Sequence, residues 1–224
     1  MPTGFQAFND GGNLQIDADY RNMLLIKSGQ FTASNSQTSA DAWYISMMNT
    51  WNNTTPFAMI AVKALYPNKL VLTPGSWKGG KKIPNFFFPQ NGTSTFQYYI
   101  YDLVPPNPAH TYGMQIFKEN GELVYSALDY PLKIIDSINT DGGAYTAPID
   151  NTALMCIGGG YFVDDDGVDV ESTFTRTWWE GRSVKVEVVH YTNPGGSGGG
   201  FWGQSTQWLM VCDVTNVPLN YSRY

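Results

Sequence analysis

The fold is decided by residues 4–27, GFQAFNDGGNLQIDADYRNMLLIK, because they return in altered form as residues 113–136, GMQIFKENGELVYSALDYPLKIID. A second pair of similar stretches lies near the end of each half: STFQYYIYDL at 94–103 and STQWLMVCDV at 205–214. In the ungapped alignment of the longer stretches, identical residues meet: Gly4, Gln6, Phe8, Gly12, Leu14, Ala18 and Ile26 with Gly113, Gln115, Phe117, Gly121, Leu123, Ala127 and Ile135. Such a repeat predicts two related units of about 110 residues, 1–112 and 113–224.

Each copy of the repeated stretch has the pattern of a β-hairpin followed by a third strand. Two short apolar runs flank a turn, NDGG in the first copy and KENG in the second. The last turn residue, Gly12 or Gly121, is expected to adopt a positive φ. Another apolar run follows at 23–27 and at 132–136, so a three-stranded meander is expected to open each half.

Further apolar and alternating runs predict the remaining strands. Thr173–Trp178 and Ser183–Tyr191 alternate in polarity, and WEGR at 179–182 is expected to join them as a tight hairpin. Phe96–Leu103 and Gln207–Val214 are apolar on both faces, which is typical of central strands. Shorter candidates in the first half are Phe57–Val62, Leu70–Thr73 and Asn85–Phe88.

The composition favours the same all-β class. Charged residues make up only 14% of the chain and aromatic residues 15%, with 23 glycines and 13 prolines. Aromatic side chains suit pleated, half-buried surfaces, and glycine and proline suit turns. Only Ala40–Trp51 has a helical spacing of large side chains, and the same letters also fit a strand. The predicted fold is therefore all-β, with two tandem related β-sandwich-like units.

Charge and hydropathy exclude several classes of partner. The net charge is −6, and only WKGGKK at 77–82 is locally basic, so nucleic-acid binding is not expected. No apolar run approaches the roughly 18 residues of a spanning helix, and the start MPTGFQAFND has no secretory pattern, so synthesis in a cytoplasm is expected. Cys156 and Cys212 lie in apolar runs, which favours two reduced core thiols over a disulfide.

No residue pattern predicts a catalytic, cofactor or metal site, and the chain is expected not to be an enzyme. The acidic run VDDDGVDVE at 163–171 lacks the full calcium-loop pattern, so a hydrated hairpin turn is favoured. His110 and His190 are the two histidines, and no zinc motif or G-x-S-x-G elbow is present. A Ser-His-Asp arrangement of residues distant in sequence stays an open alternative.

The glycine-rich segment NPGGSGGGFWGQS at 193–205 carries the strongest candidates for contact with a partner or ligand. Phe201 and Trp202 would offer large apolar area on an exposed loop at low entropic cost. Trp77, in PGSWKGG, is a weaker candidate of the same kind. The alternative is that these rings fold back and pin the loop.

The phrases GFQAFNDGGNL at 4–14 and GMQIFKENGEL at 113–123 resemble a known phrase, G-[L/F]-Q-[V/I]-F-N-x-x-G-x-L. That phrase occurs twice in small tail proteins of long-tailed bacteriophages. Ala7 departs from the family's branched residue, and Gln15–Ile16 replaces an apolar–aromatic pair that Val124–Tyr125 keeps. The resemblance implies a non-enzymatic virion protein of the tail tip, baseplate or tail fibre.

The predicted function is therefore that of a structural bacteriophage tail protein, located in the virion and acting through subunit–subunit contacts and host attachment. Tails are built on symmetry axes, so a homo-oligomer, by hypothesis a trimer, and other tail proteins are the expected partners. The alternatives are a carbohydrate-binding, lectin-like host-recognition protein and a glycan hydrolase. Assembly state and glycan binding would separate these three.

Overall fold

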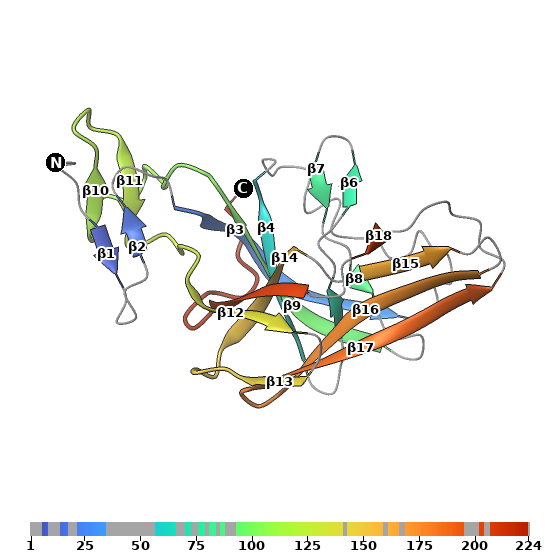
Figure 1. Cartoon of the computed structure of the whole chain (residues 1–224). Helices are drawn as coiled ribbons and strands as arrows, with labels where there is room; N and C mark the ends of the chain where they lie inside the picture. The colour runs from blue at the N-terminus through green and yellow to red at the C-terminus, as the bar shows by residue number, and fades with distance from the viewer. Residues whose placement is uncertain are drawn as a thin grey trace.

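The computed structural model describes residues 6–8, 14–17, 22–34, 57–65, 70–72, 76–78, 81–83, 86–87, 93–140, 143–158, 161–165, 169–194, 202–203 and 207–223. All regular structure in these residues is β, arranged in several antiparallel sheets (Figure 1), which confirms the all-β class. The same residues contain no helix that could cross a membrane. Gly12 and Ala40–Trp51 lie outside the described residues.

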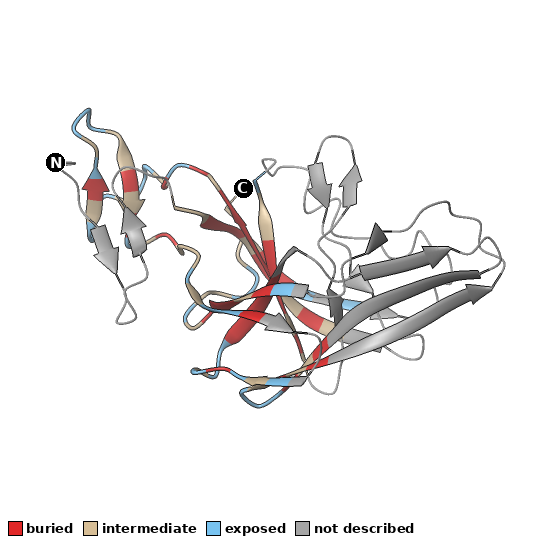
Figure 2. Ribbon diagram, viewed as in Figure 1, coloured by how far each residue is buried: buried red, intermediate tan, exposed pale blue. Residues whose placement is uncertain are grey.

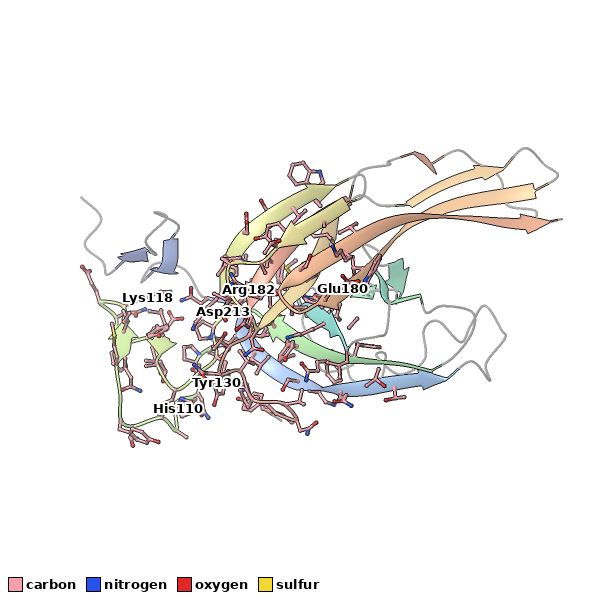
Figure 3. The ribbon with its side chains drawn as sticks, turned by 90° about the horizontal axis from the view of Figure 1, so that it is seen from below. His110, Lys118, Tyr130, Glu180, Arg182 and Asp213 are labelled. Carbon is pink, nitrogen blue, oxygen red and sulfur yellow. The ribbon has the colours of Figure 1, made fainter. Side chains whose placement is uncertain are left out.

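Both predicted opening hairpins are present, and they share one register. Strands β1 (Gln6–Phe8) and β2 (Leu14–Asp17) form the first, and β10 (Gln115–Phe117) and β11 (Leu123–Ser126) form the second. Every described pair of the second hairpin is the aligned counterpart of a pair in the first, including the irregularity before the last pair. Gly121 has a φ of +82°, as expected for its turn. The two hairpins lie at the same end of the molecule (Figures 1 and 3).

The predicted meanders are wrong, because the third strand of each copy leaves its hairpin. Strands β3 (Leu24–Ser34) and β12 (Ile134–Thr140) pair instead with β9 (Thr93–Asp102) and β19 (Gln207–Asp213). Leu24, Leu25 and Ile26 are all buried, so β3 is apolar on both faces over its first residues. A strand of that kind needs a sheet covered on both sides, which a two-stranded hairpin cannot supply.

Three strands from each half form one six-stranded sheet with the order β12-β19-β14-β4-β9-β3. In each half the closing strand lies in the middle, between the strand that follows the hairpin and one further strand, β14 (Thr152–Gly158) or β4 (Met59–Ala64). The two triplets meet where β4 and β14 pair antiparallel. The two outermost strands of this sheet, β3 and β12, each have a shift in pairing register. The shifts fall at counterpart positions, Ile26 and Ile135.

A second sheet of seven strands contains β13-β17-β16-β15-β18, with β5 attached to β16 and β8 attached to β5. Its strands are β5 (Leu70–Leu72), β8 (Phe86–Phe87), β13 (Gly143–Thr146), β15 (Tyr161–Asp165), β16 (Asp169–Glu180), β17 (Ser183–Pro194) and β18 (Trp202–Gly203). The tight hairpin predicted at 179–182 joins β16 and β17. The acidic run lies in the antiparallel pair β15–β16, with 166–168 outside the described residues.

The main core lies between the two large sheets and is shared by both halves of the chain. Val62 and Ile100 from the first half pack in one cluster with Leu154 and Val211 from the second, and with Trp179 of β16. Figure 2 shows the buried residues concentrated where the six-stranded sheet meets β16 and β17. The halves are thus joined by a common hydrophobic core, which no pattern in the sequence predicted.

The opposite face of the six-stranded sheet is covered by two segments without long strands. Leu25 donates its N–H to the Tyr130 carbonyl, and Leu132 donates to the Met23 carbonyl, each at 2.8 Å. Tyr130 and Tyr221 pack edge to face with ring centroids 5.6 Å apart. These segments close a second core cluster on this face.

Candidate interaction surface

The predicted contact residues do not come together in one described element. Trp77 lies in β6 (Ser76–Lys78), which pairs with β7 (Lys81–Ile83) as a separate two-stranded sheet. Trp202 lies in β18 and pairs with Val163 at the edge of the seven-stranded sheet, so its backbone belongs to a sheet and not to a free loop tip. Phe201 lies outside the described residues.

A different surface, on the second hairpin, carries large exposed apolar side chains. Tyr112 is 72% exposed, Met114 is 48% exposed and Phe117 is 53% exposed. Tyr112 and Met114 precede β10 and Phe117 ends it, so the three lie within six residues of the chain. We use the name contact face for these three exposed side chains. Inside the same hairpin Ile116 and Val124 are buried against each other. The hairpin therefore uses one small apolar cluster for its own packing and leaves the contact face exposed to solvent. Figure 2 shows buried and exposed stretches side by side in this hairpin.

The turn of this hairpin is held by local polar contacts. Lys118 Nζ lies 3.0 Å from Glu122 Oε2, and the Lys118 N–H donates to the Glu122 carbonyl at 2.9 Å. The Gly121 N–H donates to the Lys118 carbonyl, also at 2.9 Å. The contact face is thus mounted on a hairpin with a defined register. A two-stranded hairpin is rarely stable alone, so contacts beyond its two strands are expected to hold it.

A polar cluster ties this hairpin to the body of the molecule. We call Ser126, Asp129, His110 and Arg223 the junction cluster. The Asp129 side chain is 2% exposed and lies 3.5 Å from Arg223 Nη1. Asp129 Oδ2 accepts the Asn107 N–H at 3.2 Å. Figure 3 shows His110 and Tyr130 between the hairpin, marked by Lys118, and the large sheets.

The junction cluster holds a serine, a histidine and an aspartate, but not in the arrangement of a catalytic triad. His110 Nδ1 lies 3.2 Å from Ser126 Oγ and 3.9 Å from Asp129 Oδ1. In a triad the nucleophile and the carboxylate bind opposite ring nitrogens, whereas here both face the same one. Ser126 is also fully buried, and its Oγ accepts the Leu128 N–H at 3.3 Å. This geometry suits a structural latch.

Cys212 is a buried free thiol, as expected for a core cysteine. Burial raises the pKa of Cys212 to about 12, so the thiol is protonated at neutral pH and is a poor nucleophile. Within the described ranges, no three His, Cys, Asp or Glu side chains gather closely enough to hold a metal ion.

The chain matches no protein-family model, no curated protein and no solved structure. The motifs of the sequence did not predict the contact face, although the strand pattern contains a signal for it. Phe117 alternates with the buried Ile116, so a two-stranded hairpin must turn one of them outward. In the repeat alignment Phe117 is identical to Phe8, and that identity does not indicate whether its side chain faces outward.

Proposed function

We propose that this protein is a structural component of a bacteriophage tail that acts through subunit–subunit contacts, with the contact face as its principal interface. The observation that carries the proposal is the exposure of Tyr112, Met114 and Phe117 on a hairpin built from the tail-protein phrase. Large apolar side chains left exposed close together in the chain are typical of interaction sites, because a monomer gains nothing by leaving them in water.

The repeat supports a symmetric assembly. The two halves, by this proposal, are diverged copies of one β-sandwich-like unit, and their opening hairpins lie at the same end of the molecule (Figure 1). An end that presents two related hairpins can contact neighbouring subunits in a ring. A homo-oligomer, by hypothesis a trimer, and neighbouring tail proteins are the proposed partners. Phe201, Trp202 and Trp77 remain proposed contacts for a neighbour or a host surface.

The proposal is tested by a paired substitution on the contact face. Met114→Ser with Phe117→Ser removes the two most apolar contacts without touching the buried Ile116 and Val124. The double variant is expected to sediment as a monomer while keeping its β-rich circular dichroism spectrum. Phe57→Ser is the matched control, because Phe57 is 64% exposed elsewhere in the chain.

Location in the virion needs a separate measurement. Antibodies against the chain should decorate phage tails in negative stain, and the double variant should fail to restore tails to a phage lacking the protein. A stable monomeric wild-type protein at micromolar concentration, unchanged by the double substitution and absent from virions, would overturn the proposal. Binding on a glycan array by such a monomer would favour the lectin-like alternative.

A further inference from the structure

The two halves of the chain carry the same strand-docking edge, and among the residues that the structure describes only one of the two edges is occupied. The edges belong to β3 and β12, which are the outermost strands of the six-stranded sheet. The repeat alignment places Ile26, Lys27 and Ser28 of β3 over Ile135, Asp136 and Ser137 of β12. Both strands are irregular at the isoleucine, which turns the same backbone groups outward.

In the first half, the edge of β3 is closed by an extended segment from the end of the second half. Lys27 pairs antiparallel with Ser222. The Ser28 N–H donates to the Tyr221 carbonyl, and the Arg223 N–H donates to the Ile26 carbonyl, both at 2.9 Å. These bonds add a short strand to the sheet, and we call residues 218–223 the closing segment.

The Ser28 side chain completes this docking site. Its hydroxyl donates to the Pro218 carbonyl at 2.5 Å and accepts the Tyr221 N–H at 3.1 Å. Ser28 is only 2% exposed beneath the closing segment. One serine therefore fixes the closing segment at two places, which explains how so short a strand is held in register.

In the second half, the counterpart edge is the outer side of β12. Within the described part of the chain, nothing pairs with β12 on the side away from β19. Asp136 and Ser137 are both exposed. The segment after β9, which is the counterpart of the closing segment, runs to the junction cluster instead: Asn107 binds Asp129, and His110 lies against Ser126.

Asp136 occupies the donor that a docked strand would use. The Ser137 N–H is the counterpart of the Ser28 N–H, and it donates to Asp136 Oδ1 at 2.8 Å. The other carboxylate oxygen, Oδ2, accepts the Tyr145 hydroxyl at 2.5 Å. A charged side chain at a sheet edge discourages indiscriminate pairing. The blocking of the Ser137 N–H by Asp136 is also reversible, because a basic side chain from an incoming strand can draw the carboxylate away from the N–H.

We propose that the outer edge of β12, at residues 134–138, binds an extended segment of a neighbouring protein subunit by antiparallel strand addition, with a basic side chain opposite Asp136. The occupied edge of β3 supplies the geometry: two backbone hydrogen bonds flanking the central residue and two more through the serine hydroxyl. Asp136 makes this edge selective for a strand with a basic side chain, because opposite charges on directly paired residues stabilise a sheet and like charges destabilise it. This site is separate from the contact face and does not require the proposed function.

The experiment uses the full chain and two synthetic peptides based on its own closing segment. The first is VTNVPLNYKRY, residues 214–224 with Ser222→Lys, which places lysine opposite Asp136. The second carries Ser222→Glu. Amide exchange by NMR is expected to show protection of the Ser137 N–H by the lysine peptide, which should bind about tenfold tighter than the glutamate peptide.

Variants distinguish binding at this site from nonspecific binding of the peptides. Asp136→Lys should reverse the preference between the two peptides, and Asp136→Asn should abolish it. Asp150→Lys, the same charge change at a side chain that is 84% exposed, is the matched control and should leave the preference unchanged. Equal binding of both peptides, protection of Ser28 in place of Ser137, or no protection at millimolar peptide would each overturn the proposal. Since these readouts involve neither oligomerisation nor virions, they can fail independently of the proposed function.

Discussion

Val62 of β4 lies directly opposite Leu154 of β14, and this pair joins the two halves of the chain. Both side chains are buried in the core between the large sheets. The pairing also joins strands that occupy equivalent places in the two halves. Ile60 pairs with Ile100 as Leu154 pairs with Val211, so Ile60 and Leu154 are counterparts. Two counterpart strands thus meet antiparallel, as they would across the two-fold axis of a dimer.

The shared core predicts that the halves unfold together. Leu154→Ala should destabilise the protein by about 3 kcal/mol, because the side chain is fully buried and its loss leaves a cavity. Leu219→Ala is the control, since Leu219 is 38% exposed and should change stability by less than about 0.5 kcal/mol. Denaturant unfolding gives the free energies. Amide exchange at Ile60 and Val211 should accelerate together in Leu154→Ala. Acceleration confined to the second half would show that the halves are independent.

Gly121 should resist substitution by a branched residue. Its φ of +82° is strained for most residues with a Cβ, and for branched ones above all, although no atom lies near enough to clash. Gly121→Val is expected to destabilise the second hairpin by about 1 kcal/mol or more. Faster amide exchange of Lys118 would report the change. Gly121→Asn should have a much smaller effect, because asparagine tolerates this region of φ. Equal exchange in wild type and Gly121→Val would contradict this account of the turn.

The junction cluster should behave as a coupled pair of charges. Arg223→Met leaves the Asp129 carboxylate buried without its cation and should cost about 3 kcal/mol. The double variant Asp129→Asn with Arg223→Met should recover part of this loss, because the remaining amide is neutral. A double-mutant cycle from chemical denaturation measures the coupling. Strictly additive single effects would mean that the two residues act separately.

Cys212 should be slow to react with thiol reagents in the folded protein. Burial raises the pKa of Cys212 from 9.0 to about 12, so the folded state holds the proton where the unfolded state releases it. This group therefore contributes full stability below about pH 9 and loses that contribution as the pH rises toward about 12. Labelling in a Cys156→Ser background isolates the thiol. Rapid labelling at pH 8 without denaturant would contradict its burial.

The glycine-rich loop should be dispensable for the core. Deleting residues 195–203 removes β18, whose described pairing is limited to Phe162 with Gly203 and Val163 with Trp202. The melting temperature is expected to fall by only a few degrees, because an edge strand of two residues contributes little. Tail assembly or host adsorption should be impaired if Phe201 and Trp202 are contacts. Complete unfolding would place these rings in the core, and unchanged infectivity would leave the loop without a role.

Local pattern alone was enough to predict the strands of both hairpins, the central strands β9 and β19, and the turn between β16 and β17. Each of these depends on polarity period and turn glycines within about ten residues, which a linear sequence displays directly. The repeat likewise predicted a hairpin at the same place in each copy, and the structure shows that the two hairpins share a register. Trp202 was assigned to a loop because a glycine-rich neighbourhood carries no local strand signal, although its backbone pairs with β15.

The sequence by itself determined the all-β class and the repeated hairpin, because both depend on short-range spacing and on identities such as Phe8 with Phe117. Only the tertiary structure decided that β3 and β12 leave their hairpins and that Val62 meets Leu154. It also decided that, among the described residues, the edge of β3 is paired with another segment while the edge of β12 is not. These outcomes depend on pairing between residues far apart in the chain. Apolar strands of similar composition can pair in several orders, and burial of both sheet faces selects among them.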